Sequence, residues 1–249
     1  MSTSLSRMLS ILDLFTDLKP IWTAEEITNT LNFSMPTGYR YLRALCDSGL
    51  LARVEGGYYI IGPKIIKLDN HMRRSDPIIA IGKSVIEELV NNTGCEVLLS
   101  NLYNDEVINI YEKTPNEKES NLSYSRGRPH PLFTGSTSKI ILANLSRNRL
   151  MKLYKENKLI ISKAKLGDNW EDFNKLLSKM KRDEFCISHG ELDEGVTGIA
   201  VPIFQNNQIK GSLTLTLPTT RYSVFNIENL IELLKAAANE ITDLISRQA

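Results

Sequence analysis

The chain has 249 residues, of which 42% are hydrophobic and 24% are charged, and its formal net charge is +1. This length usually holds more than one small domain, and the composition is typical of globular proteins. The near-balance of charge excludes a histone-like polycation, although a small basic region could still sit on a neutral body. No apolar run approaches the roughly 18 residues of a membrane-spanning helix, so we expect no membrane partner.

The cysteines are three in number and far apart, so they form neither a disulfide framework nor a zinc-binding pattern; they are Cys46, Cys95 and Cys186. Cys186 and His189 are the one near pair, and on a strand two side chains three residues apart face opposite ways. We therefore expect reduced thiols, no metal and no cofactor. The N-terminus lacks the features of a signal peptide, so a cytoplasmic location is expected.

Two helices are predicted near the N-terminus. Residues 4–17 carry apolar side chains at helical spacing, which predicts one helix packed behind those that follow. Thr23 and Glu26 form a capping-box pattern that starts a second, short helix, on which Ile27 and Leu31 share a buried side. The apolar residues of the first helix are Leu5, Met8, Leu9, Leu12 and Phe15.

A third helix follows a turn at residues 32–33, and residues 36–48 separate into two faces at about 100° per residue. Ser34 is placed to cap this helix, and Pro36 lies in its first turn, where no amide proton is needed. The face expected to be buried holds Gly38, Tyr41, Leu42 and Leu45. The opposite face holds Thr37, Tyr39, Arg40, Arg43 and Ala44. Guanidinium groups bond base edges or phosphates, and hydroxyls hold phosphates, so the second face is typical of a recognition helix.

Gly49 ends this helix, and two short strands, residues 50–54 and 58–61, follow around Gly56-Gly57. A Gly-Gly pair suits a two-residue hairpin turn. The order helix, turn, helix, hairpin predicts a winged helix-turn-helix that binds DNA. A small helical subdomain with a solvated basic face is the alternative. The expected DNA contacts are Ser34, Thr37, Tyr39, Arg40, Arg43, Arg53 and Tyr58, with Tyr59 as an alternative on the wing.

Three domains are predicted. Residues 1–63 form the winged helix-turn-helix, residues 64–76 a linker helix opened by Pro63, and residues 77–249 a larger α+β domain. In this last part helices are expected at 77–92, 136–145, 147–156, 170–182 and from 227 to the end. Strands are expected at 95–103, 107–112, 122–125, 184–189, 198–204 and 209–217. The result is an antiparallel sheet with helices around it.

Several motifs resemble those of the IclR family of bacterial transcriptional regulators, over almost the whole chain. One is Gly127-Arg-x-x-Pro-Leu followed by Lys139. Another is Gly195-Val-x-Gly-Ile-Ala-Val-Pro-Ile-Phe, followed by Gly211-Ser-Leu-Thr-Leu-Thr-Leu-Pro and Arg221. The resemblance implies a GAF- or PAS-like C-terminal domain that binds a small organic effector, with an acid among the candidates. It also implies dimers or tetramers on palindromic operators, acting as repressors or activators, with repression our expectation.

The family's pocket implies an effector site from four stretches of this chain. Its residues are Ser136, Thr137, Ser188, Gly198, Thr214 and Thr216. Thr214 and Thr216 are two apart on a strand, so both hydroxyls face one side, although threonine is also simply a good strand residue. The chain departs from acid-binding relatives: it has Ser188-His189 in place of two aspartates and Gly198 in place of a cysteine. Pro36 and Gly38 also replace the usual residues of the recognition helix.

An enzyme is not expected. The three histidines, His71, His130 and His189, lie in a predicted linker, loop and strand, and no GxSxG motif, P-loop or dinucleotide fingerprint is present. A DNA-binding scaffold without a ligand is the second hypothesis. The favoured mechanism is a homodimer whose operator affinity changes when an effector binds in the C-terminal domain.

Overall fold

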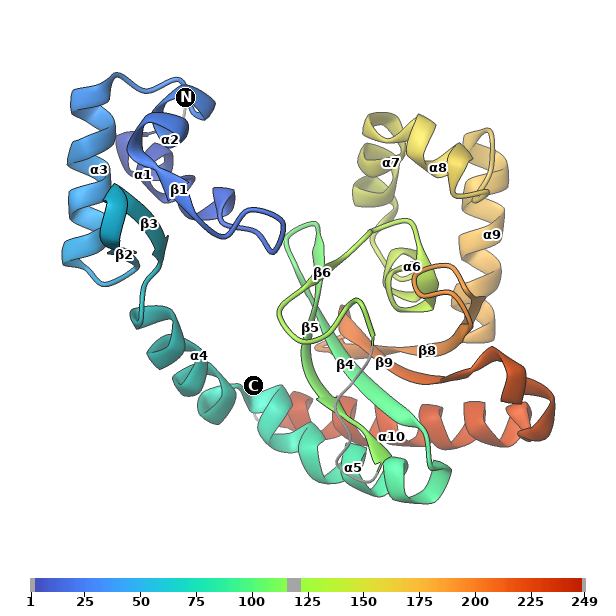
Figure 1. The fold of residues 1–249 in the computed structure, drawn as a ribbon. Helices are drawn as coiled ribbons and strands as arrows, with labels where there is room; N and C mark the ends of the chain where they lie inside the picture. The colour runs from blue at the N-terminus through green and yellow to red at the C-terminus, as the bar shows by residue number, and fades with distance from the viewer. Residues whose placement is uncertain (1–2, 116–121, 248–249) are drawn as a thin grey trace. The chain divides into compact units, whose positions relative to one another are not determined.

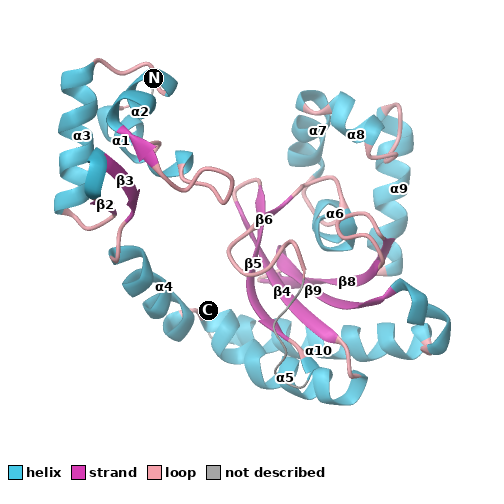
Figure 2. Ribbon diagram, viewed as in Figure 1, coloured by secondary structure: helices cyan, strands magenta, loops and turns pink. Residues whose placement is uncertain are grey.

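The structure, a computed structural model, describes residues 3–115 and 122–247. It is an α+β protein that divides into two compact units, Met1–Asp76 and Pro77–Ala249 (Figures 1 and 2). Within the described ranges, no helix is both long and apolar enough to cross a membrane.

The N-terminal unit is a helical bundle closed by a small antiparallel sheet of order β1-β3-β2. Its core centres on Ile11, Ile27, Leu42, Leu45 and Leu51, all almost fully buried. The elements are α1 (Ser4–Leu9), β1 (Trp22–Thr23), α2 (Ala24–Thr30), α3 (Met35–Asp47), β2 (Leu51–Arg53), β3 (Tyr58–Ile61) and α4 (Lys64–Ser75), and a short 3-10 turn covers Leu12–Leu14.

The start of α2 is the predicted capping box. The Thr23 hydroxyl accepts from the Glu26 amide at 3.2 Å, and the Glu26 carboxylate accepts from the Thr23 amide at 2.8 Å. Lys19 donates to the same carboxylate, and these bonds lower the pKa of Glu26 to about 2. The short helix therefore has a fixed start, which aims its C-terminal end at the turn before α3.

Gly38 is where α2 and α3 approach most closely. A Cβ at this position would lie 2.1 Å from Cγ2 of Thr28, whose hydroxyl is held by the Ala24 and Glu25 carbonyls. Gly38 is thus required by packing, and its cost to the helix is offset by the contact it permits.

Three local predictions in this unit are wrong, and one strand was missed. The first helix ends at Leu9, because the chain turns after Ser10 and buries Ile11; Leu5 and Leu9 stay exposed. Ser34 occupies the N-cap position of α3, but its hydroxyl bonds that of Thr37 and caps no amide. The hairpin loop has three residues, Glu55–Gly57, since Val54 donates to the Tyr58 carbonyl. Strand β1, which pairs with β3, was not predicted.

The C-terminal unit is built on a six-stranded antiparallel sheet of order β6-β5-β4-β9-β8-β7. Asn206 and Asn207, both with positive φ, form the predicted tight turn between β8 and β9. The strands are β4 (Glu96–Tyr103), β5 (Glu106–Lys113), β6 (Pro129–His130), β7 (Cys186–His189), β8 (Val196–Gln205) and β9 (Gln208–Pro218).

The two faces of this sheet are covered differently (Figures 1 and 2). Helices α5 (Pro77–Thr93) and α10 (Ile227–Arg247) cover one face, and their aliphatic residues interlock with the apolar alternate residues of β4, β8 and β9. Helix α6 (Gly135–Ala143), buried along its whole length, covers the other face. Helices α7 (Arg147–Glu156), α8 (Lys158–Lys163) and α9 (Trp170–Asp183) complete that side.

Two elements of this unit differ from the sequence-based expectation. Residues 122–125 form turns, not a strand, and the strand that pairs with β5 is Pro129–His130. The apolar and aromatic residues at 122–125 had suggested a strand, but they instead line the site described below. Helix α8 was also missed, because its six residues are too short for a periodic signal.

Candidate functional site

The exposed face of α3 carries the polar and basic residues expected to contact DNA. Tyr39, Arg40 and Arg43 are exposed and Thr37 is half-buried, while the opposite face is buried in the core. Arg43 lies 3.8 Å from Asp47, a loose pair between two largely exposed side chains, so its guanidinium is readily redirected to another anion. The Arg40 guanidinium lies 5.4 Å from the Tyr41 ring centroid.

The hairpin places two further candidates at the surface. Arg53 ends β2 and Tyr58 begins β3, and both are exposed. Gly56 and Gly57 have φ of 76° and 79°, which lets the three-residue loop turn tightly between them. Tyr59, the alternative, is buried in the core of this unit. Six of the seven candidates are thus exposed, and Thr37 is half-buried.

The six residues expected to bind an effector are each buried, and all line one partly open cavity of about 40 Å³ in the C-terminal unit. They come from three regions far apart in the chain: the first turn of α6, strand β7, and the paired strands β8 and β9. The remaining lining residues are Leu98, Leu122, Tyr124, His130, Glu191, Leu192, Asp193 and Val196.

Strand register explains why these residues meet. Ser188, Gly198 and Thr216 stand opposite one another on β7, β8 and β9, and Thr214 stands opposite Leu98 of β4. Side chains alternate between faces, so Ile199, Leu215 and Leu217, which neighbour these residues along the strands, point into the apolar core under α5 and α10. The face turned to α6 therefore combines hydroxyl groups with the space left by a glycine.

Hydrogen bonds fix α6 against this face. The Ser136 amide donates to the Ser188 hydroxyl at 3.0 Å, and the Thr137 and Thr214 hydroxyls are 3.0 Å apart. A Cβ on Gly198 would lie 2.6 Å from Oγ of Ser136, so any larger residue there would fill the cavity. The hydroxyls of Ser188, Thr137 and Thr214 are thereby held in place before any ligand arrives.

His130 is the main residue of the site that sequence reasoning missed. It is 95% buried, stacks on Tyr124 with ring centroids 5.1 Å apart, and finds no hydrogen-bond partner for either ring nitrogen among the described residues. Burial lowers the pKa of His130 to about 4, although Asp193 nearby acts to raise it. The ring is therefore neutral at pH 7, with one donor and one acceptor.

An internal ion pair sits at the N-terminus of α6. The Glu191 carboxylate accepts from the Gly135 amide at 2.9 Å and from the buried Lys139 ammonium at 2.5 Å. Asp193, from the same loop, accepts from the Ser123 amide at 3.1 Å. Both carboxylates that line the cavity therefore already have partners within the protein.

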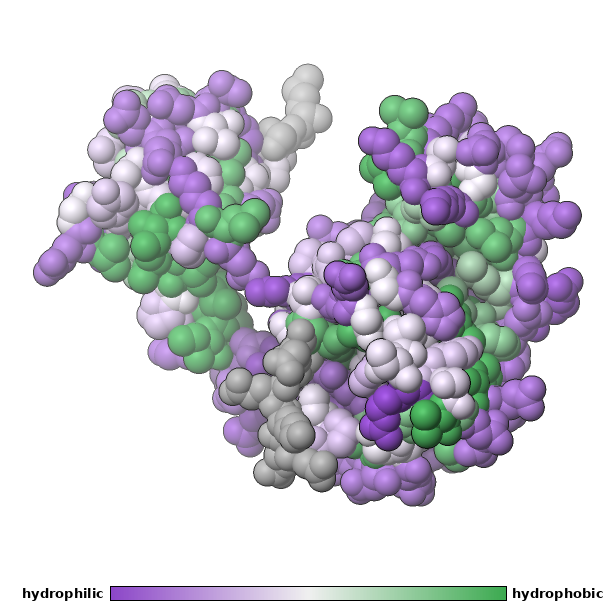
Figure 3. Space-filling model, turned by 45° about the vertical axis from the view of Figure 1, so that its right-hand side comes forward, coloured by the Kyte–Doolittle hydropathy of each residue, from purple (hydrophilic) through white to green (hydrophobic). Residues whose placement is uncertain are grey.

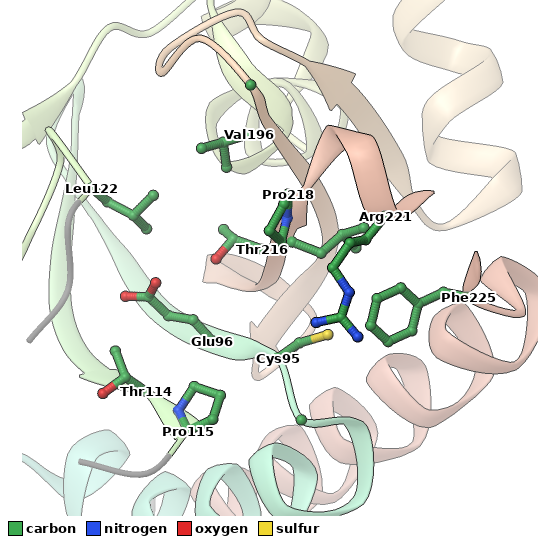
Figure 4. Close-up of a pocket in the computed structure, with 13 residues that line it drawn as sticks. Cys95, Glu96, Thr114, Pro115, Leu122, Val196, Thr216, Pro218, Arg221 and Phe225 are labelled. Carbon is green, nitrogen blue, oxygen red and sulfur yellow. The ribbon is translucent and has the colours of Figure 1, made fainter. Parts of the chain in front are cut away.

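A larger, more open pocket of about 440 Å³ adjoins the cavity and shares Leu122, Val196 and Thr216 with it (Figure 4). Arg221 lies beside Phe225 there, with its guanidinium carbon 5.1 Å from the ring centroid.

No pattern in the sequence pointed to these lining residues or to Glu191 and His130. A histidine between two prolines looked like a loop residue, and only its pairing with Val107 across β5 turns it inward.

Known regulators resemble this chain in both sequence and fold. Residues 71–243 match the family described as Bacterial transcriptional regulator IclR C-terminal. The chain belongs to the IclR family of transcriptional regulators. Among its relatives are the HTH-type transcriptional regulators KipR of Bacillus subtilis and KdgR of Escherichia coli. KipR is 24% identical over 95% of this chain and 94% of its own, and KdgR is 24% identical over 87% and 83%.

Solved structures of the IclR family share the fold. An IclR transcriptional regulator from Alicyclobacillus acidocaldarius has a TM-score of 0.79 at 22% identity, covering 97% of this chain and 98% of its own. An IclR homologue from Microbacterium hydrocarbonoxydans, solved in complex with 4-hydroxybenzoate, has a TM-score of 0.75 at 19% identity and covers 99% and 100%. The predicted family and fold class are both confirmed.

Proposed function

We propose that this transcriptional regulator binds operator DNA through the exposed face of α3, and that a small organic effector in the α6 cavity controls operator affinity. The proposal of an effector site rests on one observation, which is that residues distant in the sequence meet at one cavity. Six residues from separate stretches line one cavity, with a buried histidine that has no partner in the described structure. A buried polar group without a partner is costly, so a ligand that supplies one gains binding energy.

The DNA part rests on α3. Its exposed face offers two guanidinium groups, a phenol and a hydroxyl, while Gly38 lets the helix lie close on α2. Arg40 is the proposed base-reading residue, with Arg43, Thr37, Tyr39, Ser34, Arg53 and Tyr58 as backbone contacts. Family membership supports this assignment, since the relatives are named as HTH-type regulators.

The proposed working form is a homodimer. It would present two copies of α3 about 34 Å apart to successive major grooves. Helix α4 supports a dimer because none of its residues is buried in this chain. Its apolar residues contribute to the hydrophobic surface of the N-terminal unit (Figure 3); they are Ile65, Ile66, Leu68 and Met72. Assembly to a tetramer, repression of transcription and a cytoplasmic location stay predictions.

The testing experiment is binding of the full chain to the intergenic DNA beside its own gene, with random DNA as competitor, over a salt series. We expect a dissociation constant of roughly 10 nM or tighter for the operator, and a much weaker, more salt-dependent one for random DNA. Arg182→Ala, an exposed arginine of α9, is the matched control for Arg40→Ala. Equal binding to both DNAs would contradict a sequence-specific regulator.

Thermal stabilisation by ligands distinguishes an effector-controlled regulator from a DNA-binding scaffold that has no ligand. A ligand that binds only the folded protein stabilises it by about 2.7 kcal/mol at a hundredfold excess over Kd, whereas a scaffold gains nothing. A compound that raises Tm and also changes operator affinity would support effector control. Stabilisation without any change in operator binding would contradict it.

A further inference from the structure

We infer that the end of the effector held in the α6 cavity is an uncharged group rich in hydroxyl or amide functions, rather than a carboxylate. This rests on the proposed function, because it concerns the ligand of the same cavity. It departs from the acid that stood among the candidates in the family resemblance. Three observations carry it: the charges around the cavity, the first turn of α6, and the polar groups left without partners.

The charges near the cavity are neutralised inside the protein. Within residues 3–115 and 122–247, no lysine or arginine lines it, and its two charged lining residues are the carboxylates of Glu191 and Asp193. Lys139, a buried cation of α6, is bound to Glu191 at 2.5 Å, with the lysine side chain 7% exposed. An anionic group placed in this cavity would meet two carboxylates and no lining cation, which is unfavourable.

The first turn of α6, which could otherwise attract an anion, is also occupied. The amide of Gly135 donates to Oε2 of Glu191, and the amide of Ser136 donates to the Ser188 hydroxyl. These two donors are among the orphan amides that give a helix N-terminus its affinity for negative charge. Two amides that could bind a ligand carboxylate are thus already used, one by Glu191 and one by Ser188.

The groups that remain available are neutral and can both donate and accept. His130 offers one nitrogen of each kind, and neither has a partner among the described residues. The hydroxyls of Ser136 and Thr216 line the same space. A ligand with alternating donors and acceptors, such as a polyol, a sugar or a small amide, satisfies these groups without bringing a charge that must be desolvated.

The volume sets the size of the part that is recognised. About 40 Å³ holds only a few non-hydrogen atoms, so the cavity fits one polar end of a ligand. The adjoining pocket of about 440 Å³ shares three lining residues with it and is the space for the remainder. Arg221 lines that second pocket, so the inference concerns the end of the ligand in the cavity.

The experiment measures Tm of the full-length protein with matched pairs that differ in charge. The pairs are glycerol and glycerate, glucose and gluconate, and 4-hydroxybenzamide and 4-hydroxybenzoate, each titrated to a saturating or solubility-limited concentration. We expect a neutral member to raise Tm by about 5 °C at a hundredfold excess over Kd, and its acid partner at the same concentration to raise Tm by less. His130→Phe, which removes both nitrogens but keeps the stack on Tyr124, should abolish the shift.

A specificity change provides the sharpest form of the test. Glu191→Gln removes the carboxylate that neutralises Lys139. The lysine would then be an unpaired cation beside the site, so this variant should gain a Tm shift with the acids. Lys139→Met combined with Glu191→Gln removes both charges; it should respond to the neutral compounds and gain no response to acids. Met fills the buried space of the lysine, which guards against loss of the fold.

Two results would overturn the inference. One is a larger Tm shift of the wild-type protein with the acids than with their neutral partners. The other is no shift from either class in a protein that binds its operator. Failure of the proposed function gives different results. The protein would then not bind its operator in the absence of ligand, or its operator affinity would not change with any compound that raises Tm.

Discussion

The face of α3 and the cavity beneath α6 are two polar sites built in opposite ways. The α3 face is contiguous in sequence, exposed and cationic, and its arginines make few internal bonds. The cavity is assembled from distant strands and a helix end, is only partly open, and has its charges paired within the protein. The first arrangement suits a polyanion that supplies its own counter-charges. The second suits a ligand recognised by hydrogen bonds, where desolvation penalises charge.

The largest effect expected from this contrast is a pH dependence of the buried site. Burial lowers the pKa of His130 to about 4, so between pH 6.5 and 4 the unfolded chain binds a proton that the folded one does not. Stability is therefore full above about pH 6.5 and falls by about 3 kcal/mol as pH drops to 4. Urea unfolding followed by Trp170 fluorescence in a Trp22→Phe background measures it.

His130→Phe is the matched variant for this experiment. It should lose less stability than the parent protein over the same pH range, because its ring cannot be protonated. Parallel pH curves for the two proteins would mean that His130 is not held neutral by burial.

The next effect concerns the exposed site. Arg40→Ala should weaken operator binding by roughly 10- to 100-fold, about 1–3 kcal/mol, and affect random DNA much less if Arg40 reads a base. Its Tm should stay close to that of the wild-type protein, because the side chain is exposed. Competition binding with operator and random DNA measures both losses. An equal loss on the two DNAs would assign Arg40 to a phosphate.

A packing effect of similar size lies behind the same helix. Gly38→Ala should lower stability by about 1–2 kcal/mol, despite the better helix propensity of alanine, because its Cβ would clash with Cγ2 of Thr28. Thr28→Ser removes that methyl group and keeps the hydroxyl bonds, so the double variant should recover most of the loss. Chemical unfolding of the single and double variants tests this, and a stabilised Gly38→Ala protein would refute the packing role.

The smallest effect is expected at Arg43. Its pair with Asp47 is exposed, so Arg43→Ala should change the free energy of unfolding by less than about 0.5 kcal/mol. It should nevertheless reduce the salt dependence of DNA binding by about one unit of slope if it contacts a phosphate. Thermal unfolding and a salt titration give the two values. A marked loss of stability in Arg43→Ala would mean that the exposed face of α3 also stabilises the fold.

The same contrast explains what could be predicted from the sequence. Capping at Thr23, the two faces of α3 and the asparagine turn at 206–207 are local patterns, and the structure reproduces them. The first helix was predicted too long, because periodicity does not register the turn that buries Ile11. Such failures come from tertiary packing that overrides a local pattern.

The cavity could be predicted only in part. All six expected residues came from the family resemblance, and strand alternation added only that Thr214 and Thr216 face one side of the sheet. His130 and Glu191 carry no local pattern: one is turned inward by a two-residue strand, and the other reaches back to Lys139 and the start of α6 across more than 50 residues. Contacts of that separation depend on the assembled sheet.

The most direct test of the account is operator affinity measured against increasing concentration of a compound that raises Tm, in the wild-type protein and in Gly198→Val. The valine side chain would occupy the cavity, since even a Cβ there lies 2.6 Å from Oγ of Ser136. We predict a change of about 5- to 150-fold in operator affinity for the wild-type protein, the usual range of coupling between sites, and no change for the variant. An identical response in both proteins would mean that the effector acts elsewhere, and would contradict the central claim.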